Sequence, residues 1–270
     1  MTGPGGGTSI AIGESGELAT RILGIPVHGT SYEQATQLIL EAAEKGKAGF
    51  VCHANVHMVM EGYDSVQFAE ILERALLVTP DGMPLVWVMR LLGMPDQERV
   101  YGPTMMLKIC ERAEKQGISI GLLGTTARAL DLLRSNLHRR FPALQIAYHH
   151  APPFRQLSDE ENLVIAREIE SSGAKLVFVA LGCPKQEKWM AQVTEHVPAI
   201  LLGVGAAFDF LSGSQKQAPS WVGQLGLEWL FRLCQEPRRL LYRYLKHNPR
   251  FVLLATIDVI KKKRATWRRS

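Results

Sequence analysis

The sequence has few cysteines and no long apolar run. Its 270 residues include four cysteines, and no two of them stand in a C-x-x-C spacing. This argues against a disulfide scaffold or a structural zinc site, and it is typical of the reducing cytoplasm. The longest apolar candidate, residues 251–260, falls well short of the roughly 20 residues that a membrane-spanning helix needs, and the N-terminus lacks the features of a signal peptide. We therefore predict a cytoplasmic protein that does not span a membrane.

Motifs for metals and dinucleotides are also missing. Many nucleotide-sugar enzymes hold a divalent ion with an Asp-x-Asp pair, and no such pair occurs here. The eight histidines show no H-E-x-x-H or comparable ligand spacing. We therefore predict neither a metal site nor a cofactor. The absence of G-x-G-x-x-G also disfavours a Rossmann-type enzyme that uses NAD(P) or a methyl donor.

Negative charge is nearly absent from the end of the chain. Residues 238–270 hold eleven Lys and Arg and one acid, Asp258, so this segment carries +10; the whole chain carries +5, which leaves −5 for residues 1–237. Nucleic acid and anionic lipid both attract such a segment. Apolar residues between the charges favour lipid, because they offer a face that inserts. We predict docking on an anionic membrane surface and no binding to nucleic acid.

Apolar runs alternate with helical patterns over residues 18–218. The strand-like runs are residues 49–52, 76–79, 118–123, 144–148, 175–181 and 199–204. This alternation predicts an α/β core with a mostly parallel, Rossmann-like sheet and helices on both faces. Residues 219–270 have helical patterns only, with breaks expected at Pro237 and Pro249, and predict a helical, basic, membrane-docking appendage. The glycine-rich residues 1–17 predict a flexible tail.

Local signals predict where several helices begin and end. Thr30 with Glu33, and Ser158 with Glu161, have the spacing of a capping box, in which two side chains satisfy the free amides of a first turn. Four glycines fall where helices should end: Gly46, Gly93, Gly117 and Gly173.

Polar residues follow the predicted strands, at the edge where such sheets bind ligands. Asn55 can bind a sugar hydroxyl, although capping the next helix is the commoner role. Asp81 lies in Pro80-Asp81-Gly82, and two explanations are equally good: a common turn sequence, or a carboxylate placed as a general base. Arg99 can grip a carboxylate or a phosphate, although a solvated arginine is the commoner case.

Three later segments bear on a nucleotide site. The run from Gly121 to Gly124, between a strand and a helix, can bring backbone amides to a phosphate, but no Walker lysine follows and the signal is weak. Lys185, Gln186 and Glu187 directly follow an apolar strand, and helix capping does not account for the whole cluster. For Asp209, after the last strand, we expect a structural role.

Six short motifs occur in order between about Arg21 and Arg250. They are Asn55 after the first strand, Pro80-Asp81-Gly82, Glu98-Arg99-Val100-x-Gly102, Gly182-x-Pro184-Lys185-Gln186-Glu187, Gly205-Ala206-x-Phe208-Asp209, and Gly226-Leu227-Glu228-Trp229-Leu230-x-Arg232 followed by Glu236-Pro237. Through these motifs the chain resembles the WecG/TagA/CpsF family of bacterial glycosyltransferases. Each motif is weak alone, but six in this order are specific.

The resemblance implies an inverting, metal-independent glycosyltransferase. It would move a sugar from a UDP donor to an undecaprenyl-diphosphate-linked sugar, in cell-surface polysaccharide or teichoic-acid-type biosynthesis at the inner face of the plasma membrane. The sugar implied is N-acetylmannosamine, with its uronic acid or glucose as alternatives. A homo-oligomer stays open. The rival hypotheses are a Rossmann-type NAD(P) or methyl-donor enzyme and a membrane adaptor without catalytic activity.

The resemblance also implies roles for residues of the core. By position in the motifs, Asp81 corresponds to the general base, and Asn55 and Arg99 correspond to residues that contact substrate. Gln186 falls on the glutamine of the nucleotide-sugar pocket. His53 stands where the family usually has Thr, and it is the fourth core residue that we predict to contact substrate.

In the family the C-terminal appendage folds over the active site at the membrane. The resemblance implies that Arg232, Arg239 and Arg243 bind substrate from there. These roles are physically reasonable, because a UDP leaving group develops negative charge. Without a metal, positive side chains must compensate for that charge.

Overall fold

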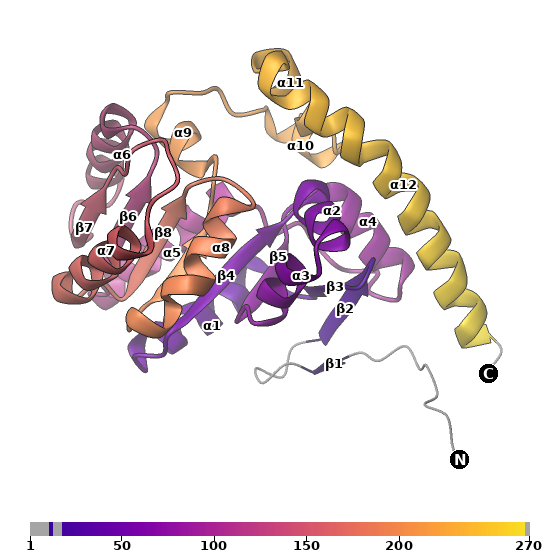
Figure 1. The fold of residues 1–270 in the computed structure, drawn as a ribbon, viewed down its shortest axis with the longest axis horizontal. Helices are drawn as coiled ribbons and strands as arrows, with labels where there is room; N and C mark the ends of the chain where they lie inside the picture. The colour runs from indigo at the N-terminus through magenta and orange to yellow at the C-terminus, as the bar shows by residue number, and fades with distance from the viewer. Residues whose placement is uncertain (1–10, 13–17, 268–270) are drawn as a thin grey trace.

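Parallel strands form the central sheet of the protein, whose computed structural model describes residues 11–12 and 18–267 (Figure 1). In that part of the chain the sheet has six strands in the order β5-β4-β9-β8-β6-β7, and neighbouring strands are parallel. They are β4 (Gly49–Ala54), β5 (Leu77–Pro80), β6 (Ile120–Gly124), β7 (Ile146–His150), β8 (Leu176–Ala180) and β9 (Ile200–Gly203). The prediction of a mostly parallel sheet from the six apolar runs is confirmed.

Helices bury both faces of this sheet. Along β8, Leu176 and Phe178 pack into one hydrophobic cluster, whereas Val177 and Val179 pack into the other. The first cluster includes residues of α1 (Tyr32–Glu44), α5 (Gly102–Gln116), α6 (Ala127–Arg140) and α9 (Ala207–Ser212). The second includes residues of α2 (Val56–Asp64), α3 (Val66–Glu73), α4 (Met83–Leu91), α7 (Asp159–Ser172) and α8 (Lys185–Val193). Because side chains alternate across a strand, such a sheet requires continuous apolar runs.

The predicted helix signals are confirmed with one correction. Ser158 and Glu161 form the expected capping box of α7, and Gly117 and Gly173 end α5 and α7 with φ of 68° and 72°. The box of α1 lies one residue later than predicted, at Ser31 and Gln34. Thr30 is not the cap: its amide donates to Gln97 Oε1 at 3.1 Å.

A small antiparallel sheet precedes the core and was not predicted. It consists of β1 (Ala11–Ile12), β2 (Leu18–Ile22) and β3 (Ile25–His28). Except for residues 11–12, which pair with β2, the expected flexible tail (residues 1–17) lies outside the described residues. His28 Nδ1 accepts from the Val78 amide at 3.0 Å, which ties β3 to β5. The sequence hides the hairpin because Leu23 occupies a turn position with a φ of 52°, where Asn, Asp or Gly is usual, and because Pro26 interrupts the pattern of β3.

The C-terminal appendage consists of α10 (Ser220–Gln224), α11 (Glu228–Gln235) and α12 (Pro237–Trp267). The predicted break at Pro237 is confirmed, because α12 begins there. The predicted break at Pro249 is wrong, because α12 runs through it for 31 residues. Proline removes a helical hydrogen bond, but Phe251 and Ala255, on the next turns, are buried against the core. The packing of Phe251 and Ala255 against the core therefore outweighs the cost of the hydrogen bond that Pro249 removes.

Helix α12 runs past α2 and α4 toward the N-terminal hairpin (Figure 1). Arg250 makes two hydrogen bonds to Asp64 of α2, at 2.7 and 2.8 Å. Near its end, Asp258 accepts from the Leu23 amide at 3.5 Å. In the described part of the chain, no helix combines the length and apolarity that crossing a membrane requires.

Candidate active site

A cavity of about 510 Å³ lies between the core and the appendage. Its polar lining comes from both parts: Asn55, His57, Asp81, Arg99, Glu228, Arg232, Arg243, Tyr244, Asn248 and Thr256. The rest of the lining is largely apolar and includes Met83, Trp87, Leu227, Trp229, Val252 and Ile260. The volume is in the range of small-molecule sites, which combine apolar walls with a few convergent polar groups. The carboxyl ends of β4 and β5 open into this cavity, at the edge where parallel sheets bind ligands.

Asp81 joins the end of β5 to the cavity. Its amide and that of Gly82 donate to the Ala54 carbonyl at 2.8 and 3.0 Å, so the turn is tied to the end of β4. A Cβ on Gly82 would lie 3.2 Å from the Asn55 Cα, which explains the glycine. The Asp81 carboxylate accepts from the Gly102 amide at 3.1 Å and from Arg99 Nη2 at 3.3 Å. Asp81 is therefore both a turn residue and a carboxylate at the cavity.

Burial raises the pKa of Asp81 above its ordinary value of 3.8, although Arg99, the Gly102 amide and Arg232 each act to lower it. A carboxylate is a better proton acceptor when its pKa moves toward the working pH. The Arg99 guanidinium and the Gly102 amide favour the charged carboxylate, which is the form that can take a proton from a hydroxyl.

Arg99 links Asp81 to the appendage. Its Nη2 also donates to Glu228 Oε2 of α11 at 2.6 Å, and its Nε donates to the Asp81 carbonyl. The Tyr101 hydroxyl donates to the other Glu228 oxygen at 2.9 Å, and the Arg99 guanidinium stacks 4.0 Å from the Tyr101 ring. Burial acts to lower the pKa of Arg99, but the two carboxylates outweigh it and raise the pKa. Arg99 is therefore held in an ion pair with Glu228, between the core and the appendage. A substrate that binds Arg99 as predicted must compete with Glu228.

Glu228 is a residue at the site that sequence reasoning missed. It lies within the Gly226-to-Arg232 motif, so the motif marked the segment. It did not assign Glu228 a role, because its partners Arg99 and Tyr101 lie more than 120 residues earlier.

The appendage arginines differ in their surroundings. Arg232 and Arg243 line the cavity, and the Nε of each is buried without a hydrogen-bond partner among the described residues. Arg239 is not part of the lining, is exposed, and pairs with Glu236 at 2.7 Å. The structure therefore brings two of the three predicted arginines to the cavity. Buried donors without partners are suited to an anionic ligand.

Asn55 caps α2 and also lines the cavity. Its Oδ1 accepts from the Met58 amide at 3.2 Å, so the capping role is present. The amide nitrogen of its side chain is not needed for the cap. Substrate contact by Asn55 stays a prediction.

His53 lies behind the cavity wall. Its Nδ1 is 2.6 Å from Thr79 Oγ1, and its Nε2 is buried without a partner among the described residues. Burial lowers the pKa of His53 to about 4, so the ring is neutral. A Cβ on Gly102 would lie 3.5 Å from the His53 ring and 3.4 Å from Asp81 Oδ2. His53 therefore supports the segment that holds Asp81, and its predicted contact with substrate stays a prediction.

Gln186 is buried at the start of α8, outside the cavity. Its Nε2 donates to Glu187 Oε1 at 2.6 Å, and it packs against Gly203, at the end of β9. Burial raises the pKa of Glu187 to about 7. The Gln186 Oε1 has no partner among the described residues. Gln186 lies at the same edge of the sheet as the cavity, and its contact with the nucleotide sugar stays a prediction.

The glycine run of β6 also ends at this edge. A Cβ on Gly124 would come within 2.4 Å of the Ala180 carbonyl oxygen, so the glycine permits close approach of two strands. Thr125 Oγ1 donates to Asp209 Oδ1 at 3.1 Å. This bond agrees with the structural role expected for Asp209.

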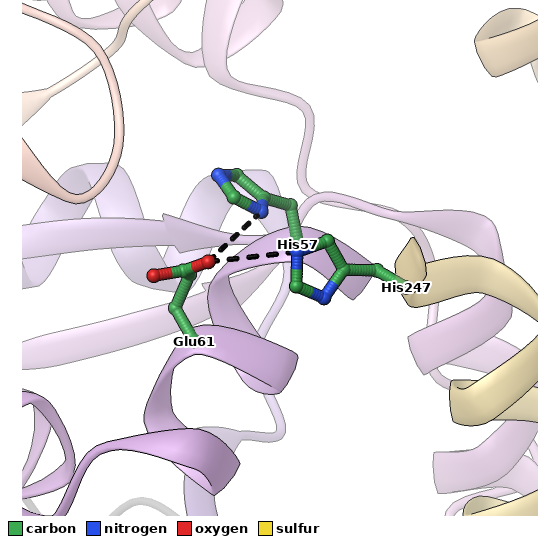
Figure 2. A group of neighbouring side chains, drawn as sticks. All are labelled: His57, Glu61 and His247. Atoms are coloured by element: carbon green, nitrogen blue, oxygen red, sulfur yellow. Dashed lines mark ion pairs between the residues drawn. The ribbon is translucent and has the colours of Figure 1, made fainter. Parts of the chain in front are cut away.

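A group of His and Glu side chains at the junction of α2 and α12 was also missed (Figure 2). His57 and Glu61 come from α2, and His247 comes from α12. Burial lowers the pKa of His57 to about 4, and it also lowers the pKa of His247. These three residues are potential metal ligands, whereas the sequence spacing predicted none, because His247 lies far along the chain.

Comparisons with known proteins match a family model and several named relatives to most of the chain. The profile of the family described as "Glycosyl transferase WecG/TagA/CpsF family" matches residues 20–265. A Bacillus spizizenii protein named N-acetylglucosaminyldiphosphoundecaprenol N-acetyl-beta-D-mannosaminyltransferase is 29% identical over 83% of this chain and 83% of its own. Proteins of the same name are 29% identical in Bacillus subtilis, over 73% of this chain and 74% of theirs, and 26% identical in Staphylococcus aureus, over 81% and 85%.

Proposed function

The chain belongs to the WecG/TagA/CpsF family of glycosyl transferases, and on this premise we propose that it transfers N-acetylmannosamine from UDP to undecaprenyl-diphosphate-linked N-acetylglucosamine. The donor sugar and the acceptor follow the shared name of its relatives. The observation that carries the proposal is the cavity in which a core carboxylate, Asp81, meets two appendage arginines, Arg232 and Arg243.

Asp81 is the general base of this proposal. The acceptor hydroxyl attacks the anomeric carbon and loses its proton to the Asp81 carboxylate, while the bond from that carbon to the UDP oxygen breaks. Attack opposite the leaving group inverts the anomeric carbon. The Gly102 amide and Arg99 hold the carboxylate in place, so little reorganisation is needed at the moment of reaction.

Arg232 and Arg243 compensate for the charge that develops on UDP. Each has a buried Nε without a partner among the described residues, and a low-dielectric, preorganised donor is most effective where negative charge develops. We propose that this step needs no metal. Asn55, Arg99, Gln186, His53 and Arg239 are proposed as further substrate contacts, in line with the family motifs.

The appendage is proposed to dock on the anionic inner face of the plasma membrane, where a lipid-linked acceptor is found. Outside the cavity lining, α12 exposes apolar residues that include Leu241, Tyr242, Leu245 and Leu253. Exposed basic residues flank them, among them Arg238, Lys246, Lys261 and Arg264. Apolar insertion together with basic charge is the pattern of helices that lie on anionic membranes.

The test is a panel of UDP sugars offered with a short-chain polyprenyl-diphosphate N-acetylglucosamine, with products identified by mass spectrometry. We expect one product, larger by one N-acetylhexosamine, from UDP-N-acetylmannosamine. Transfer from the UDP-linked uronic acid of N-acetylmannosamine or from UDP-glucose instead would change the proposed donor sugar but not the proposed type of reaction. Binding of NAD(P)H or S-adenosylmethionine without any transfer would overturn the proposal.

A further inference from the structure

Two imidazoles and a carboxylate converge where α12 packs on α2 (Figure 2). His57 and Glu61 stand four residues apart on α2, so their side chains share one helix face. Glu61 Oε1 lies 3.8 Å from His57 Nδ1 and 3.5 Å from His247 Nε2. The three ligand atoms all lie within 4.8 Å of one another.

We propose that His57, Glu61 and His247 bind a Zn²⁺ ion that fastens α12 to the core. Two histidine nitrogens and one carboxylate oxygen are a common zinc ligand set, with water in the fourth position. In a tetrahedral site with bonds of about 2.0–2.2 Å, ligand atoms stand about 3.3–3.6 Å apart. The two separations from Glu61 Oε1, 3.5 and 3.8 Å, therefore need a shift of only a few tenths of an ångström. The two histidine nitrogens lie within 4.8 Å of each other and must approach by at most about 1.5 Å.

The atoms of these side chains that face one another do not form normal hydrogen bonds. Both separations exceed the roughly 3.2 Å upper end of a normal nitrogen–oxygen hydrogen bond. His57 Nδ1 is buried, points at Glu61, and has no hydrogen-bond partner among the described residues. His247 is 2% exposed. Buried polar atoms are rarely left without a partner, and an ion between the three side chains supplies one.

The surrounding charges select the kind of ion. Arg243 and Lys246 lie close enough to act on the His57 ring, and Lys246 and Arg250 act on His247. These cations oppose an ion that is held by charge alone, so Mg²⁺ and Ca²⁺, which prefer several oxygen ligands, are disfavoured. Zn²⁺ bonds to imidazole nitrogen and tolerates this setting better.

The position of the site indicates what the ion does. His247 stands one turn after Arg243, and both His57 and Arg243 line the cavity. An ion shared by α2 and α12 therefore holds Arg243 at the cavity by a bond across the junction. This inference does not depend on which sugar is transferred, and a failure to bind zinc leaves the proposed transfer untouched.

The test uses the full chain without an affinity tag, dialysed against a chelator and then titrated with Zn²⁺. Bound zinc is measured by elemental analysis, and the melting temperature is recorded with and without zinc. We expect one zinc per chain and a rise in melting temperature of about 5 °C or more at zinc concentrations well above Kd.

Ligand and control variants separate this site from adventitious binding. Glu61→Gln, which keeps the shape of the side chain, and His247→Gln should each weaken zinc binding at least about 100-fold and abolish the rise in melting temperature. His138→Gln, on the exposed side of α6, and Cys234→Ser, which removes an exposed thiol, should bind zinc like the unmodified chain.

Any of three results would overturn the proposal. The first is an unmodified chain that takes up no zinc. The second is a Glu61→Gln chain that binds zinc as tightly as the unmodified chain, and the third is a Cys234→Ser chain that loses the zinc. If His247→Gln does not fold, Glu61→Gln and the unmodified chain still decide whether zinc binds at this site. A Co²⁺-substituted chain adds an independent readout, because its visible absorption distinguishes nitrogen and oxygen ligands from a thiolate.

Discussion

The core buries most of its apolar residues, whereas the appendage leaves many of its own exposed. Every residue of β4 is buried, whereas no residue of α11 is. On α12 one side is buried against the core at Phe251 and Ala255, while Tyr242 and Leu245 on the other side are 76% and 66% exposed. The core finds its apolar partners within the chain. The exposed side of α12 has no apolar partner among the described residues, and an unpartnered apolar face flanked by basic residues is suited to a membrane.

The same difference appears at the cavity. The core holds the Asp81 carboxylate with a backbone amide and Arg99. The appendage offers Arg232 and Arg243 with donors that have no partner among the described residues. In the proposed mechanism the core therefore supplies a base that is already in place, and the appendage supplies cations that a substrate can still engage.

Asp81→Asn tests the core's contribution, and we expect the largest effect from it. Turnover should fall by about two orders of magnitude or more, the usual contribution of a positioned base, while fold and donor binding persist. Initial rates and calorimetric titration with the donor would measure both. Near-normal turnover in this variant would remove Asp81 from the mechanism.

Replacing Arg232 and Arg243 together by Met tests the appendage's contribution. We expect turnover to fall about 10- to 100-fold with a soluble acceptor, because the leaving group loses its cations. Arg238→Met is the matched control, since Arg238 is exposed and lies outside the cavity lining; we expect a change of less than about threefold. An equal loss of turnover in the double variant and in the control variant would mean that a position in the cavity lining gives Arg232 and Arg243 no special role.

Leu245→Ser with Leu253→Ser tests whether the exposed side of α12 meets lipid. Affinity for vesicles containing anionic phospholipid should fall about 30-fold, because each of the two leucines contributes on the order of 1 kcal/mol on partial insertion. Co-sedimentation measures this. Leu132→Ser with Val164→Ser, two exposed apolar residues of core helices, is the control. If both pairs weakened binding alike, the docking surface would not be confined to the appendage.

Glu228→Gln tests the link between the two regions and should have the smallest effect. Turnover should fall a few-fold. Without the Glu228 charge, Arg99 acts more fully on Asp81 and lowers its pKa. A base with a lower pKa stays ionised to lower pH, so the acid limb of the kcat–pH profile should move down. An acid limb that stays in place would mean that Glu228 does not act on Asp81.

Local pattern was enough to predict much of this molecule. The six strands, the capping box at Ser158 and the start of α12 at Pro237 were predicted, because apolar periodicity and capping residues act within a few positions of chain. The motifs marked Asp81, and the parallel sheet explains why Asp81 reaches the cavity. The hairpin around Leu23 and Gly24 and the continuity of α12 through Pro249 were not predicted, because distant packing decides them.

The sequence by itself determined the class of the sheet, the polar residues at its carboxyl edge and the basic charge of the appendage, since each is written in residue types and short spacings. Only the tertiary structure decided which of these residues meet. It paired Glu228 with Arg99, brought His247 to His57 and Glu61, and left Gln186 outside the cavity. The physical reason is that these contacts join residues many turns or strands apart. Their distances depend on how α11 and α12 pack on the core, and no local pattern encodes that packing.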